Sequence, residues 1–102
     1  MLTATTAPSA YRFNFAEGTD LAEVRETLAL ALLAAESIHG AAQVNLDGNC
    51  QVCDERCAVL IDIGTEVGVD VARLFVGFAV KQFVGMKVER VTRTPAAVGG
   101  VN

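Results

Sequence analysis

The chain has 102 residues, enough for one domain with a small core and too few for two. Its net charge of −4, with no run of Lys or Arg, argues against nucleic acid as a partner, because such binding rests on neutralising phosphates. The longest apolar run, residues 28–35, is shorter than the ~20 residues that cross a bilayer, so we expect no membrane segment. The N-terminal residues lack the basic and apolar regions of a secretory signal, which predicts a cytoplasmic protein with reduced thiols.

The first half of the chain switches between strand and helix periodicity. Residues 1–9 are rich in Thr, Ala, Ser and Pro, which predicts a flexible tail. The stretch YRFNF, residues 11–15, alternates aromatic and polar side chains and is typical of a half-buried strand. Asp20 and Glu23 have the spacing of a helix capping box, so a helix is predicted over 21–38.

A hairpin is predicted next. The stretch AQVNLD, residues 42–47, alternates apolar and polar side chains like a strand, and Asp47-Gly48 is a turn dipeptide. The returning strand is CAVLIDI, residues 57–63, with Cys57 in phase with the inward-facing residues.

The second half repeats the pattern of the first. A glycine-punctuated loop, GTEVGVD, leads into a helix predicted over 69–84, and MKVERV forms a short last strand. Residues 92–102 are predicted to be a second flexible tail, which leaves 10–91 as a single domain. The predicted core stripes of the two helices are Leu21, Val24, Leu28, Leu32 and Ala35, and Val71, Leu74, Phe75 and Phe78.

The element order β-α-β-β-α-β predicts the ferredoxin-like fold class, a two-layer sandwich with a four-stranded antiparallel sheet and two helices on one face. The outward face of that sheet is predicted to be polar and simply solvated, and it offers no aromatic platform for RNA bases. The residues predicted on it are Arg12, Asn14, Gln43, Asn45, Asp62, Lys87 and Glu89.

The three cysteines lie close together, and two of them form a C-x2-C pair, Cys50 and Cys53. Such a pair on a hairpin predicts a possible zinc site completed by nearby carboxylates, although a lone pair is weakly specific and plain structural cysteines are favoured. A thiol redox pair is the third interpretation. The only histidine, His39, belongs at the opposite end of the domain, where we expect it to face solvent near a helix C-terminus.

A second apolar stripe on each helix is the most informative feature of the sequence. Hydrophobic residues make up 52% of the chain, toward the high end for a soluble domain, so something must cover the surplus. By the rule of about 100° per residue, several apolar side chains fall away from the predicted core stripes and form a predicted interface. They are Leu30, Leu33, Val69, Val76, Val80 and Phe83.

These features predict a non-enzymatic module that acts through protein–protein association, because no nucleophile is placed beside an evident base. A homo-oligomer, above all a two-fold dimer, is the favoured partner, and a heterologous protein is the alternative. Cover by the chain's own tails, or contact between the two helices that buries part of the second stripe, would remove the need for either partner. Two other functions stay open: a metal-binding or thiol-sensing protein using Cys50 and Cys53, and a small-ligand regulatory domain.

Overall fold

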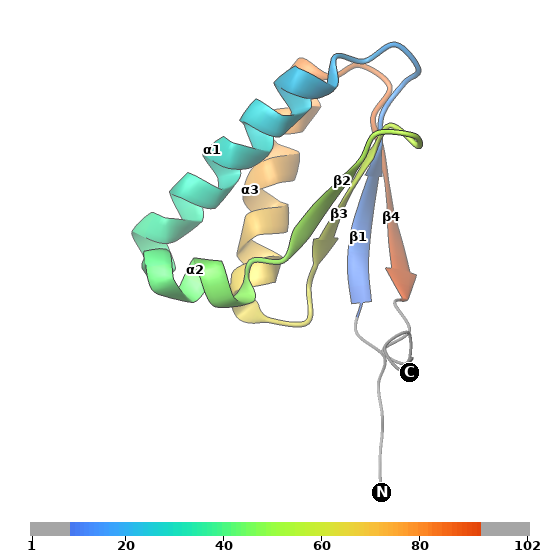
Figure 1. Ribbon diagram of the computed structural model, residues 1–102. Coiled ribbons are helices and arrows are strands. Elements are labelled where there is room, and N and C mark those ends of the chain that lie inside the picture. Colours follow the sequence, from blue (N-terminus) through green and yellow to red (C-terminus); the bar gives the residue numbers. More distant parts are fainter. Residues whose placement is uncertain (1–8, 93–102) are drawn as a thin grey trace, which may run out of the picture.

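The computed structural model describes residues 9–92 as four strands and three helices (Figure 1). The elements are β1 (Ser9–Asn14), α1 (Leu21–His39), α2 (Ala41–Asp47), β2 (Cys50–Cys53), β3 (Ala58–Asp62), α3 (Glu66–Gln82) and β4 (Lys87–Thr92). The architecture is α+β, with an open four-stranded antiparallel sheet and the helices on one side of it. Ser9 and Thr92, predicted to lie in the tails, are strand ends, and the rest of both predicted tails lies outside the described residues.

The sheet has the strand order β2-β3-β1-β4. Phe13 of β1 lies between Val59 of β3 and Val88 of β4 in the two antiparallel ladders. Because neighbouring residues across a ladder share a face, these three side chains all point toward the helices. Phe13 and Val59 are buried, which confirms the alternation predicted for residues 11–15 and 57–63.

The start of α1 is confirmed. Asp20 is its N-cap, and the Asp20 carboxylate accepts a hydrogen bond from the amide of Ala22 at 3.0 Å, which satisfies one of the free amides at the helix start. The helix ends at His39 because Gly40 takes a φ of 89°, which glycine adopts without steric penalty. The inward stripe includes buried Val24, Leu28 and Ala35, as predicted.

Helix α3 begins at Glu66, earlier than the predicted residue 69. The Thr65 hydroxyl caps it by accepting a hydrogen bond from the Gly68 amide at 3.0 Å, which extends the helix into the predicted loop. The helix ends at Gln82, and Phe83 is already extended, with φ −116° and ψ 109°. Among the predicted core residues, Val71 and Phe75 are fully buried, while Leu74 and Phe78 are partly buried against the core.

The strand predicted over 42–47 is wrong: these residues lie in α2. The register of the β2–β3 ladder explains why, since Cys50 lies opposite Ile61 and β3 ends at Asp62. A longer β2 would find no strand beside it, so the backbone of this segment satisfies its polar groups through local helical hydrogen bonds instead. The predicted Asp47-Gly48 turn is therefore not the hairpin turn, and β2 and β3 are joined by residues 54–57.

A row of edge-to-face aromatic contacts fixes α3 on β1. The ring of Phe75 lies 4.9 Å from that of Phe13 and 6.2 Å from that of Phe15, measured between centroids. Phe83, just after the helix, packs on Phe15 at 5.3 Å. Each such pair adds about 0.5–1.5 kcal/mol beyond the burial of its area.

Among residues 9–92, no helix combines the length and apolar character that crossing a bilayer requires.

Gly68 marks the closest approach of α3 to the sheet. A methyl group built at this position would overlap the backbone carbonyl of Asp62, which cannot move without shifting β3. We expect Gly68→Ala to lower the free energy of unfolding in urea by about 2 kcal/mol or more. The matched control is Gly64→Ala, where the added methyl meets nothing within 4 Å. Equal stability of the two variants would contradict this account of the packing.

Candidate functional site

The structure places Cys50 and Cys53 in the edge strand β2, not in a loop. Cys50 lies opposite Ile61 and faces the core, whereas Cys53 lies opposite Ala58 on the other face. With a rise of about 3.3 Å per residue, their Cα atoms are roughly 10 Å apart along the strand. The structure therefore does not bring these two thiols together as the C-x2-C spacing suggests.

Cys57 lies in the turn before β3, with a φ of 51°, and is partly buried at the edge of the core. Its thiol donates a long hydrogen bond of 3.6 Å to the carbonyl of Ala16. Within residues 9–92, no three His, Cys, Asp or Glu side chains are grouped closely enough to hold a metal ion. Zinc binding through Cys50 and Cys53 stays a prediction from sequence spacing.

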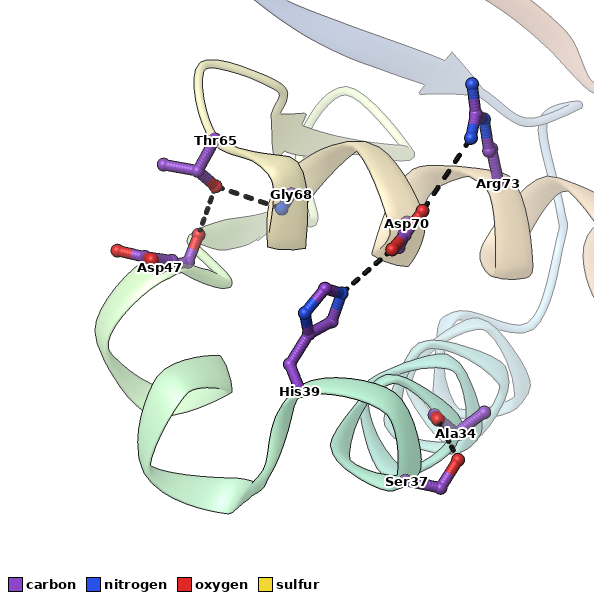
Figure 2. A network of polar contacts seen from close by, with 8 residues as sticks. All are labelled: Ala34, Ser37, His39, Asp47, Thr65, Gly68, Asp70 and Arg73. Carbon is purple, nitrogen blue, oxygen red and sulfur yellow. Dashed lines mark hydrogen bonds and ion pairs between the residues drawn. The ribbon is translucent and has the colours of Figure 1, made fainter.

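The prediction that His39 faces solvent is wrong. Its Nε2 lies 2.8 Å from a carboxylate oxygen of Asp70, and only 16% of its side chain is exposed. Figure 2 shows the ring reaching from the end of α1 to α3, with Arg73 on the far side of Asp70. The neighbouring Ser37 hydroxyl donates a hydrogen bond within its own helix to the carbonyl oxygen of Ala34. The contact between His39 and Asp70 joins the two long helices.

The predicted interface residues divide into three groups. Leu30, Leu33 and Val80 are 53%, 62% and 64% exposed, which agrees with the angular prediction. Val69 and Val76 are partly buried. The prediction is wrong for Phe83, which is only 8% exposed and packs in the aromatic row. The helix ends before this residue, so the angular rule does not apply to it.

Two polar contacts fix the alignment of α1 and α3. Thr27 Oγ1 lies 3.1 Å from Gln82 Oε1 near one end of the helix pair, and His39 contacts Asp70 near the other. The helices are therefore antiparallel neighbours. The same offset places Leu30 at the level of Val80.

We call the exposed apolar residues on the outer side of this pair the helix-face patch; they are Leu30, Leu33, Gly77 and Val80. Gly77 is the member that the sequence analysis missed. It is exposed in the middle of α3, and a Cβ atom there would meet nothing within 4 Å. A mid-helix glycine costs about 1 kcal/mol relative to alanine, so this position favours close approach of another surface.

Charges of opposite sign border the patch. Glu23 and Glu26 are exposed on α1, and Arg73 and Lys81 are exposed on α3. The patch therefore has an acidic side on one helix and a basic side on the other.

The outer face of the sheet is only partly polar. Arg12, Asn14, Asp62, Lys87 and Glu89 lie on it as predicted, but the strand registers place Leu60 and Val91 there too, and Gln43 and Asn45 lie in α2 instead. On this face Glu89 Oε2 accepts hydrogen bonds from Arg12 Nη2 at 2.7 Å, Arg12 Nε at 2.9 Å and Asn14 Nδ2 at 2.9 Å. The bonds from Arg12, followed by that from Asn14, lower the pKa of the Glu89 carboxyl. On this face, Arg12 and Glu89 are therefore paired with one another.

Burial raises the pKa of the Cys50 thiol, which leaves less of the reactive thiolate near neutral pH. We expect the variant that keeps only Cys50 to react with a thiol reagent more slowly than the variants that keep only Cys53 or only Cys57. All three should reach the same rate in denaturant, which serves as the control. Faster reaction of Cys50 in the folded protein would contradict its placement against the core.

Arg12→Gln should raise the pKa of Glu89 toward its ordinary value, as followed by NMR titration of the side-chain carboxyl. Because the folded-state pKa is lowered, the stabilisation from this pairing is present above the unfolded pKa of about 4.3 and is lost as pH falls through the lower folded value. The variant should therefore lose less stability on acidification. The control is Arg25→Gln, which removes a different exposed ion pair, the one with Asp54. It should leave the pKa of Glu89 unchanged.

In comparisons with protein-family models, curated proteins and solved structures, nothing matches this chain. Its function is therefore inferred from its own geometry.

Proposed function

We propose that this chain is a small non-enzymatic α+β module that self-associates as a two-fold dimer through the helix-face patch. The observation that carries the proposal is the position of Leu30 and Val80, both more than half exposed and level with one another across two antiparallel helices. Exposed leucine and valine side chains are ordinary when scattered. Here they are grouped on one face, which is typical of an interaction surface.

Gly77 supports a tightly packed contact rather than a loose one. Small residues let helix backbones approach closely, and the space above Gly77 is open. A stable two-fold interface buries about 800 Å² on each subunit. The outer sides of α1 and α3, which have 19 and 17 residues, are long enough to supply much of this area.

The border charges favour a second copy of the chain as the partner. A two-fold axis parallel to the helices would place α1 of one subunit over α3 of the other, at the same level. Glu26 would then lie near Lys81 of the other subunit, and the arrangement repeats by symmetry. A heterologous protein would need matching charges of its own.

We also propose that the fold is ferredoxin-like and that the protein acts in the cytoplasm. Apart from the short α2, the elements follow the order β-α-β-β-α-β, and both long helices lie on one side of the sheet, which supports the fold assignment. The cytoplasmic location rests on the sequence alone.

Leu30→Glu should convert the dimer to a monomer, because it would bury a carboxylate in an apolar contact without a partner. The measurement is the mass in solution, by sedimentation equilibrium over a range of concentrations. The matched control is Leu46→Glu, the same change at a residue that is 71% exposed on α2, outside the patch. If the unmodified chain is a monomer at all concentrations, the proposal fails.

Gly77→Ala separates packing at the interface from stability of the subunit. Alanine should stabilise the isolated helix by about 0.5–1 kcal/mol, and its methyl group should weaken dimerisation by keeping the two surfaces apart. The effect of Gly77→Ala is measured twice. Its effect on the free energy of unfolding in urea is measured in the Leu30→Glu background, and its effect on the dimer dissociation constant is measured in the parent chain. A variant that raises stability and leaves dimerisation unchanged would place the contact elsewhere.

A further inference from the structure

An apolar pocket of about 330 Å³ opens between α3 and the strands β1 and β4. It is lined by Tyr11, Phe13, Ala72, Arg73, Val76 and Val88. Val76, predicted from sequence as an interface residue, is thus part of this pocket. The volume is at the lower end of the range for small-molecule sites.

The pocket exists because the helices do not cover β4. Val88 and Val59 both face the helix layer, yet Val88 is 44% exposed and Val59 is fully buried. Two of the lining residues are Tyr11 and Phe13, whose rings are in edge contact with centroids 6.3 Å apart. An aliphatic chain or an aromatic ring would find apolar surface on three sides here.

Two arginines stand at this side of the domain although the chain is acidic overall. The Arg73 side chain is 77% exposed, and Figure 2 shows it extending from α3 toward the sheet. Its contact with Asp70 is 3.7 Å long, beyond hydrogen-bond distance, while the other oxygen of Asp70 is held by His39. Arg90 of β4 lies opposite Tyr11 on the helix-facing side of the sheet.

We propose that this pocket binds a small organic carboxylate with an apolar body, such as a medium-chain fatty acid. The apolar body lies against Phe13, Val76 and Val88, and the carboxylate pairs with the guanidinium of Arg73. A guanidinium presents parallel N–H donors that match the two oxygens of a carboxylate. A neutral apolar molecule would leave this donor group unused.

The pocket and the helix-face patch are separate, although Arg73 lines the pocket and also borders the patch. The effect of Arg73→Gln on octanoate binding is therefore measured in the Leu30→Glu background as well as in the parent. None of the lining residues belongs to the patch itself. The Leu30→Glu variant should therefore bind the same ligand. Loss of the dimer with retained binding, or the reverse, distinguishes the two proposals.

The test is a titration of the full-length chain with octanoate, and separately with 1-octanol, followed by amide shifts in ¹H–¹⁵N NMR spectra. We expect saturable shifts centred on the pocket residues, with a Kd of about 1 mM or tighter for octanoate. Arg73→Gln should weaken octanoate binding roughly 5- to 10-fold and change octanol binding less than about twofold. Val88→Trp, which fills the mouth of the pocket with a strand-compatible side chain, should abolish binding of both.

Matched controls identify the site. Lys87→Gln removes a positive charge from β4 on the outer face of the sheet, and Val84→Trp adds the same bulk at a residue that is 92% exposed. Both should leave octanoate binding unchanged. The proposal is overturned if octanoate gives no saturable shifts, if the shifts lie elsewhere, or if Lys87→Gln weakens binding as much as Arg73→Gln.

Discussion

The rotation of α3 about its own axis is the constraint on which the rest of the structure depends. The ring of Phe75 packs edge-to-face on those of Phe13 and Phe15, and Phe83, just beyond the helix end, packs on Phe15. Because successive helical residues are about 100° apart, anchoring Phe75 on β1 also decides where every other side chain of α3 points. Gly77 and Val80 turn to the outer surface, and Val76 turns toward β4.

Polar contacts then set how far the two long helices slide past one another. Thr27 with Gln82 and His39 with Asp70 lie toward opposite ends of the pair, so a shift of one turn would break both. These contacts use the only histidine of the chain as a structural link. They bring Leu30 of α1 level with Val80 of α3.

The candidate site could be predicted in part. The exposure of Leu30, Leu33 and Val80 follows from helical geometry once the core stripe is known, and the sequence reveals that stripe. The same rule fails at Phe83, because its backbone is extended and the angular projection ends with the helix. The pocket beside Val88 has no signal in the sequence, since it arises from the distance between a helix and a strand far apart along the chain.

The sequence by itself determined the elements with strong local signals: the strand of alternating aromatics around Phe13, the capped start of α1 at Asp20 and the inward stripes of both long helices. Only the tertiary structure decided the state of residues 42–47, whose alternation fits a strand as well as a short helix. No strand is available beside them once β3 ends at Asp62, so the backbone forms a helix. The same register puts Cys50 and Cys53 on opposite faces of an edge strand, because pairing between strands, not spacing along the chain, determines which way each side chain points.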